Sequence, residues 1–312
     1  MILMEYILLR LLDLLNLIPE LNLNNQDFCI ELKPFSKNIL LIKNIMKTRL
    51  LAILNLITLG FQLLMSYLIQ VKSLSTQDVG QVSAKYDTVF APAGLTFTIW
   101  GLIYIALSAF CVFHLYKAFA KTSSCQTNQD TQNIGWLFAL NNIATGLWLI
   151  AWVNEQLLVS VGLILIQLFT LIRISIKAHI SNPDRPVQTK IFTQFPLSIY
   201  FAWICIASIA NISAWLNSTG WNAMGISESY WVIILIGVAS LLSLFIILVR
   251  RNTPFGFVVL WALYGIILKR KQVDEQLYED VINAAYAAFV IILVALIIRI
   301  FKKYGPQASV NY

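Results

Sequence analysis

The sequence predicts an all-α protein, a polytopic transmembrane bundle of about eight helices. Of its 312 residues, 59% are hydrophobic and only 12% are charged, and the mean hydropathy is +0.75. Soluble globular domains average roughly 45–50% apolar and about 25% charged residues. The apolar residues also fall into regular runs of about 20, the length that a helix needs to cross roughly 30 Å of hydrocarbon. A water-soluble domain is therefore excluded.

Eight apolar runs are candidates for membrane-spanning helices. In chain order they are Leu50–Gln70, Ala93–Tyr116, Ile134–Trp152, Leu157–Ile176, Ile191–Leu216, Tyr230–Val249, Phe255–Leu268 and Val281–Ile300. The seventh run has only 14 residues. A run of that length is often a re-entrant or interfacial segment, so both interpretations of this run stay open.

Basic residues cluster between the runs, which is how lysine and arginine fix the orientation of a membrane protein. We therefore do not expect nucleic-acid binding, despite the net charge of +7. With the N-terminus inside, only Lys72, Lys85 and the cluster Lys269–Lys271 fall outside. This pattern predicts a cell-membrane protein with both termini cytoplasmic, or with the C-terminus outside if the seventh run re-enters the membrane.

Residues 1–45 differ from the rest of the chain. Met1–Ile18 is leucine-rich but carries charged side chains, and no signal-peptide cleavage site follows it. Met46 begins a Met-Lys-Thr-Arg segment that is typical of the start of a membrane protein with its N-terminus inside. We expect translation to begin at Met46, and the alternative is a cytoplasmic amphipathic lead-in.

Aromatic residues share one helix face in the second run. A polar loop turns through Pro92 and Gly94 straight into the helix, and Phe97, Trp100 and Tyr104 follow at spacings of three and four residues. Residues at these spacings lie on one side of a helix. For this segment alone, helix–helix packing is the simpler explanation.

The fifth run carries a comparable face. Pro196, Tyr200, Trp203, Ala207 and Asn211 are spaced by four, three, four and four residues, so they fall within a sector of roughly 80°. Such a face predicts either close helix packing or the wall of a ligand site.

In the third run, Asn141, Trp148 and Trp152 share a face, and Asn142 lies beside it. An amide inside a bilayer needs a hydrogen-bond partner, because an unsatisfied polar group there costs several kcal/mol. These asparagines therefore either join helices or orient a ligand.

These segments resemble the TspO/MBR family, the tryptophan-rich sensory proteins and mitochondrial translocator proteins. Pro92, Phe97, Trp100 and Tyr104 match a Pro-Pro-x-x-x-Phe-x-x-x-Trp-x-x-x-Tyr motif of that family, with Phe97 one residue closer to the tryptophan. The fifth run reproduces the family's Trp-x-x-x-Ala-x-x-x-Asn spacing, and Asn142 and Trp148 match the third helix at a longer interval. The resemblance covers residues 50–216, so the chain is similar to a divergent member extended at its C-terminus.

The resemblance implies a five-helix TspO-like unit at 46–216, three additional helices at 217–304 and a tail at 305–312. It further implies a pocket near the first loop for a porphyrin, a haem-like tetrapyrrole or a sterol-like ligand. The implied ligand-binding residues are Pro92, Phe97, Trp100, Tyr104, Asn142, Trp148, Tyr200, Trp203, Ala207 and Asn211. In relatives, close helix packing favours a homodimer, although this sequence contains no GxxxG motif to place the interface.

Other classes of function have less support in the sequence. The two histidines have no nucleophile nearby, and we find neither a hydrolase motif nor a phosphate-binding loop, so we expect no catalytic residue, metal site or cofactor. The leading hypothesis is a membrane protein that binds an aromatic ligand in a sensing or carrier role. The alternatives are a small-solute transporter and a membrane enzyme that modifies a porphyrin-like compound.

Overall fold

The computed structural model describes residues 28–120 and 125–304, and this part of the chain contains helices but no β-strand. Within these residues, eight helices are long and apolar enough to cross a membrane, which confirms the predicted all-α bundle. The principal helices are α2 (Phe28–Gln70), α3 (Val79–Lys85), α4 (Ile99–Phe119), α5 (Cys125–Ile134), α6 (Trp136–Val153), α7 (Leu157–Lys177), α9 (Phe195–Ser218), α10 (Glu228–Leu244), α11 (Thr253–Asp274) and α12 (Glu279–Tyr304).

Shorter helical segments complete the description. They are η1 (Gly94–Thr98), α8 (Val187–Thr189), η2 (Lys190–Gln194), η3 (Ala223–Gly225) and η4 (Phe245–Val249). The chain divides after Met46 into two compact units, residues 1–46 and 47–312. The described part of the first unit is the N-terminal portion of α2, which the sequence placed in a lead-in. The rest of that lead-in and the predicted tail at 305–312 lie outside the described residues.

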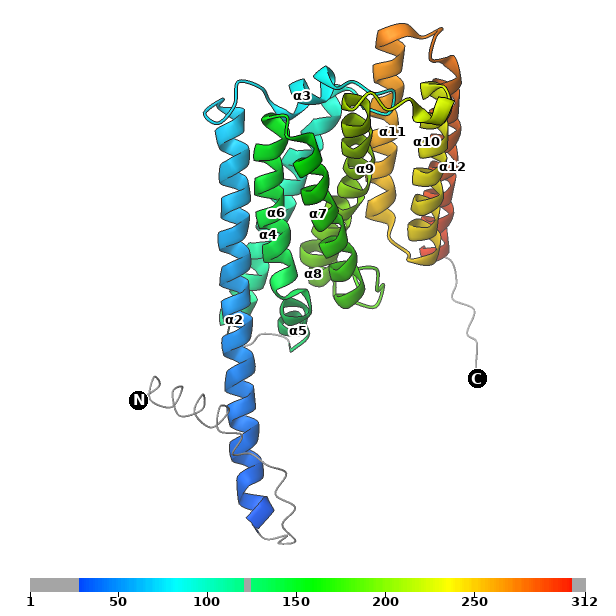
Figure 1. Cartoon of the computed structure of the whole chain (residues 1–312). Coiled ribbons are helices and arrows are strands. Elements are labelled where there is room, and N and C mark those ends of the chain that lie inside the picture. Colours follow the sequence, from blue (N-terminus) through cyan, green and yellow to red (C-terminus); the bar gives the residue numbers. More distant parts are fainter. Residues whose placement is uncertain (1–27, 121–124, 305–312) are drawn as a thin grey trace. The chain divides into compact units, whose positions relative to one another are not determined.

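In the second unit, α9 is the helix that two groups of helices share. It packs against α4 and α7, and also against α11, while α6 packs on α7 and α12 packs on α10 and α11. Figure 1 shows α10, α11 and α12 together on one side of α9, with α4, α6 and α7 on the other. The pocket described below is therefore next to a helix that contacts the C-terminal group directly.

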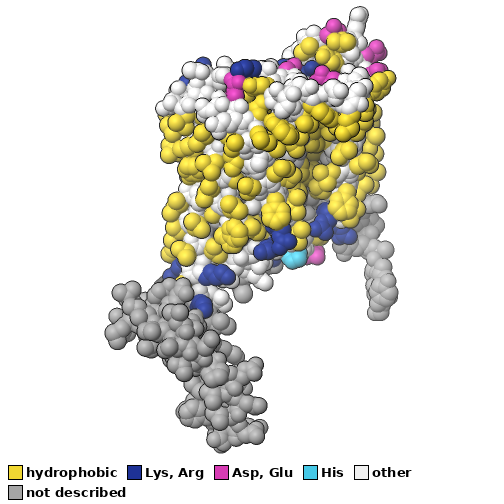
Figure 2. All heavy atoms as spheres, viewed as in Figure 1, with side chains coloured by type: hydrophobic (Ala, Val, Ile, Leu, Met, Phe, Trp, Pro, Cys, Tyr) yellow, Lys and Arg dark blue, Asp and Glu magenta, His cyan; other side chains and the backbone are white. Residues whose placement is uncertain are grey.

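Large apolar side chains cover the outer faces of these helices. Leu50, Ile105 and Leu241, for example, are 67%, 72% and 70% exposed. Figure 2 shows hydrophobic side chains across the middle of the helical region and charged side chains gathered toward its two ends. Soluble proteins rarely expose apolar surface on this scale, whereas lipid tails cover it in a membrane. The chain is an integral membrane protein.

The seventh span is longer than its apolar run. α11 is a continuous helix of 22 residues. It begins where Asn252 Oδ1 accepts a hydrogen bond from the Phe255 backbone N–H at 3.3 Å. It continues past Leu268 through three basic residues, because the Arg270 side chain is buried against Asp87 instead of facing lipid. α11 therefore has the length and composition of a spanning helix, which favours a full span over the re-entrant alternative.

The fifth span also differs from its apolar run at one end. The helix is continuous from Val187 to Ser218 and contains a π-helical turn at Lys190–Gln194, just before Pro196. Proline has no backbone N–H, so it interrupts the hydrogen-bond ladder of an α-helix. The wider turn accommodates this interruption without a break, and the face from Tyr200 onward keeps regular α-helical spacing.

Candidate ligand-binding pocket

Aromatic rings from three helices meet at the start of α4. The ring centroid of Trp100 lies 5.4 Å from that of Tyr104 and 6.2 Å from that of Trp148 in α6. It also lies 6.1 Å and 6.3 Å from the centroids of Tyr200 and Trp203 in α9. Ring pairs at such distances contribute about 0.5–1.5 kcal/mol beyond their buried area. The aromatic faces predicted separately for three helices thus converge in the fold.

A pocket lies beside this cluster, between the helices and the segment that precedes α4. Its open volume is about 30 Å³. The predicted site residues that line it are Pro92, Phe97, Trp100, Trp148, Trp203, Ala207 and Asn211. Further lining comes from α3 and the loop after it, including Val79, Tyr86 and Thr88, and from Trp152.

Three predicted site residues do not line this pocket. Tyr104 and Tyr200 pack against the Trp100 ring, and the Tyr200 hydroxyl shares a 2.7 Å hydrogen bond with Thr145 Oγ1. Asn142 Nδ2 donates to Thr58 Oγ1 at 3.2 Å, which joins α6 to α2. In this structure the two tyrosines support the pocket from behind, and Asn142 has the helix-joining role that the sequence left open.

Asn211 connects three helices at the pocket wall. Its Oδ1 accepts a hydrogen bond of 2.8 Å from Trp148 Nε1 in α6, and its Nδ2 donates at 2.8 Å to Ser160 Oγ in α7. Because Asn211 is in α9, the two bonds fix the position of the Trp148 indole relative to both neighbouring helices. The orientation of this pocket wall therefore depends on a single amide.

Two indole N–H groups at the pocket are unused. Trp100 is 8% exposed and Trp203 is 1% exposed, and neither Nε1 has a hydrogen-bond partner among the described residues. The same holds for the buried Thr88 Oγ1. Buried donors are normally satisfied, because leaving one unpaired costs about 1–3 kcal/mol. Three residues that line the pocket thus carry hydrogen-bonding groups without a partner among the described residues.

Residues 75–86, which include α3 and are called the cover segment here, lie over one side of the pocket. Asp78 caps α3, since its Oδ1 accepts from the Gln81 backbone N–H at 2.8 Å while Gln81 Oε1 accepts from the Asp78 N–H at 2.9 Å. Trp152 Nε1 donates to the Val79 carbonyl at 3.1 Å. One tryptophan of the pocket therefore holds the cover segment directly.

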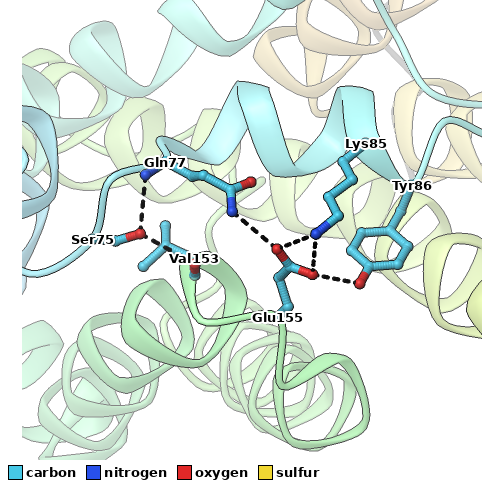
Figure 3. Close-up of polar contacts among 6 residues, drawn as sticks. All are labelled: Ser75, Gln77, Lys85, Tyr86, Val153 and Glu155. Carbon is cyan, nitrogen blue, oxygen red and sulfur yellow. Dashed lines mark hydrogen bonds and ion pairs between the residues drawn. The ribbon is translucent and has the colours of Figure 1, made fainter.

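Glu155, in the turn between α6 and α7, binds residues at both ends of the cover segment (Figure 3). Lys85 Nζ donates to its two carboxylate oxygens at 2.6 Å and 2.7 Å. The Tyr86 hydroxyl donates at 2.6 Å and Gln77 Nε2 donates at 2.9 Å. Ser75 Oγ adds a 3.2 Å bond to the Val153 carbonyl, so four residues of the cover segment bind one short turn.

Little in the sequence predicts this anchor. Glu155 lies in a tight turn between two apolar runs, where an acidic residue is ordinarily a solvated surface group. Its backbone φ of 58° places it in the left-handed region, which non-glycine residues seldom adopt. Glu155 follows Lys85 by 70 positions and Tyr86 by 69 positions, so no local sequence pattern pairs it with either residue.

The anchor shifts the ionisation of its own groups. The hydrogen bond from Lys85, followed by those from Tyr86 and Gln77, lowers the pKa of Glu155 from 4.5 to about 2. The same contact raises the pKa of Lys85. Because the carboxyl pKa is depressed in the folded state, its stabilising effect is present above pH 4.5 and is lost as the pH falls toward about 2. The anchor therefore stays ionised throughout the neutral range.

Hydrogen exchange of the α3 amides tests this anchor. We expect exchange, corrected for the intrinsic rate, to be constant between about pH 5 and 8, because neither partner titrates there. Glu155→Gln should accelerate exchange in α3 by about 2- to 5-fold, since it removes one solvent-accessible ion pair. Glu275→Gln is the matched control, because it removes the exposed pair between Lys271 Nζ and Glu275 at 3.0 Å, which involves no residue of the cover segment. Equal exchange in the two variants would contradict the anchoring role.

Comparison with known proteins gives one result. A model of the TSPO-like protein family matches residues 52–298 of the chain. The matched range begins within α2 and ends within α12, so it includes the helices after residue 216 that the motif resemblance did not reach. No curated protein and no solved structure gives a significant match. The match confirms the family resemblance, but a fold family alone does not identify a ligand.

Proposed function

Because the chain belongs to the TSPO-like protein family, we propose that it binds a flat, largely apolar aromatic ligand of the porphyrin type, in a sensing or carrier role. The observation that carries the proposal is the convergence of Trp100, Trp148 and Trp203, from three helices, on one pocket. Indole rings bury the faces of a flat molecule without requiring many directed hydrogen bonds.

The unused donors at the pocket refine the class of ligand. The indole N–H groups of Trp100 and Trp203 and the Thr88 hydroxyl favour a molecule with hydrogen-bond acceptors at its edge. Among the described residues, no charged side chain lines the pocket, so its walls suit the apolar ring of a ligand. Porphyrins fit this description, because their ring faces are apolar and their polar substituents lie at the periphery.

Entry of such a ligand requires the pocket to open. Ligand sites for molecules of drug size are about 300–1,000 Å³, whereas the open volume here is about 30 Å³. The cover segment is the wall most suited to move, because a few side-chain bonds to Glu155 and Trp152 hold it in place. Binding in this proposal selects an open state in which the cover segment has separated from the helices.

Titration of the full-length protein in detergent with protoporphyrin IX tests the proposal. We expect a saturable change in porphyrin absorbance, and we expect Trp100→Phe to raise Kd by about 3- to 10-fold because it removes ring contacts and the indole donor. Phenylalanine keeps the site apolar, so the bundle should still fold. Absence of saturable binding to the unchanged protein would overturn the proposed function.

Trp231→Phe is the control for this titration. Trp231 packs against Trp221 at a centroid distance of 5.3 Å and does not line the pocket. This variant loses one of the nine tryptophans without changing the pocket, so its Kd should equal that of the unchanged protein. An equal loss of affinity in both variants would show that the porphyrin binds elsewhere. If the porphyrin binds at this pocket, porphyrin uptake into proteoliposomes would distinguish a carrier from a sensor.

A further inference from the structure

One wall of the pocket is formed by residues 87–97, which precede α4, and α11 holds this wall from outside. The Ala93 backbone N–H donates to the Gly265 carbonyl at 3.0 Å, and Trp261 Nε1 donates to the Thr96 carbonyl at 3.0 Å. Gly265, which accepts, and Trp261, which donates, are four residues apart on α11, so they lie on one face of the helix. The segment between Pro92 and Phe97, which contributes two lining residues, is therefore bonded to a helix that does not itself line the pocket.

Gly265 allows this contact because it has no side chain. A Cβ atom at this position would collide with Thr96 Oγ1 and would lie 3.0 Å from Pro92 Cβ. Thr96 is 2% exposed, so its side chain cannot move out into solvent. The close approach of α11 to the wall thus requires glycine at position 265.

A second contact fixes the beginning of the wall, at Asp87. Arg270, one turn further along α11, is buried and donates from Nη2 to both carboxylate oxygens of Asp87, at 3.1 Å and 3.3 Å. The guanidinium also lies over the Tyr278 ring, 5.1 Å from its centroid. Asp87 directly precedes Thr88, a lining residue, so α11 holds the wall at both of its ends.

We propose that α11 is a positioning element of the pocket, with Gly265, Trp261 and Arg270 setting where the wall at residues 87–97 stands relative to the indoles of α6 and α9. This inference rests on the proposed function and gives the C-terminal helices a role in it. The three residues are positioning residues, because they act through the wall and do not touch the ligand. Displacement of the wall changes affinity while the aromatic cluster remains intact.

Two glycines on α11 provide a matched test. Gly265→Ala pushes against the wall, whereas Gly256→Ala meets Ile247 Cδ1 at 2.7 Å and Leu296 Cδ2 at 2.8 Å, in the contacts of α11 with η4 and α12. Both changes overpack the same helix, so both should lower the unfolding temperature. Only Gly265→Ala should weaken protoporphyrin IX binding, by about 10-fold. Trp261→Phe, which removes one hydrogen bond without adding volume, should weaken it by about 3-fold.

A second substitution separates positioning from general damage. Adding Thr96→Ala to Gly265→Ala removes the hydroxyl that collides, although Thr96 Cβ and Pro92 Cβ remain 3.0 Å from the added methyl group, so the double variant should regain part of the lost affinity. Unchanged affinity in Gly265→Ala, or equal losses in Gly265→Ala and Gly256→Ala, would overturn the inference.

Hydrogen exchange keeps the inference testable without a ligand. Amides of residues 88–97 should exchange faster in Gly265→Ala than in Gly256→Ala. If the unchanged protein binds no porphyrin, the proposed function fails, and the exchange measurement still decides whether α11 positions the wall. Equal exchange in the two variants would refute the positioning role whatever the ligand is.

Discussion

Replacing Asp87 by alanine is expected to lower the free energy of unfolding by about 2–3 kcal/mol, because it leaves the Arg270 guanidinium buried without its carboxylate. Removal of one partner of a fully buried ion pair costs about 3–5 kcal/mol. The Asp87 side chain is 32% exposed, so solvent already screens part of this interaction and the expected value is lower. The loss should also release the start of the pocket wall.

The two buried cysteines offer a measurement of this effect. Cys111 and Cys205 are both buried free thiols, so a thiol-reactive dye labels them only when the bundle opens. With Cys29 and Cys125 changed to serine, the labelling midpoint on heating reports unfolding of the membrane helices. Asp87→Ala should lower this midpoint clearly.

The double variant Asp87→Ala with Arg270→Met is the control. A buried ion pair replaced by apolar residues of similar volume is often neutral in stability, so the double variant should recover most of the lost midpoint. Arg270→Met alone should cost less than Asp87→Ala, because Asp87 stays partly solvated and has Lys269 Nζ at 3.7 Å. A double variant as unstable as Asp87→Ala would show that the carboxylate stabilises the fold in another way.

The same ion pair shows which features of the fold can be predicted from the sequence and which cannot. Hydropathy located all eight spans, because crossing a bilayer demands a run of apolar residues at every helix. It ended the seventh at Leu268, since Lys269, Arg270 and Lys271 raise the local polarity. In the fold these cations face Asp87 and Glu275, so the helix continues to Asp274. Their carboxylate partner in the first loop could not be inferred from a window along one helix.

The candidate site, too, is predictable from the sequence only in part. Helical periodicity placed Trp100, Trp148 and Trp203 on the correct faces, because residues that share a face do so whatever the helix packs against. Periodicity does not say how helices rotate against each other, so it left the role of Asn142 open; the family resemblance placed Asn142 at the pocket, whereas its amide faces α2. Glu155 and Tyr86 lie in turns without any period, and only the tertiary structure brings them together.

Asn211→Leu is expected to weaken both the bundle and the pocket. Leucine is close to asparagine in size but leaves the Trp148 indole N–H without its acceptor and Ser160 Oγ without its donor. The free energy of unfolding should fall by about 1–2 kcal/mol, since interhelical hydrogen bonds in membranes are individually modest. Trp148 is then free to turn away from the pocket, so Kd for protoporphyrin IX should rise by about 10-fold.

Asn141→Leu separates these two effects. Asn141 Nδ2 donates to Thr170 Oγ1 at 2.7 Å and to the Gln167 carbonyl at 3.0 Å, so it joins α6 to α7 without lining the pocket. Its loss should lower the thiol-labelling midpoint about as much as Asn211→Leu does and leave porphyrin affinity unchanged. If both variants lose affinity equally, Asn211 contributes only to bundle stability, and the position of Trp148 does not control binding. If Asn211→Leu alone loses affinity, the amide between α6 and α9 orients the pocket.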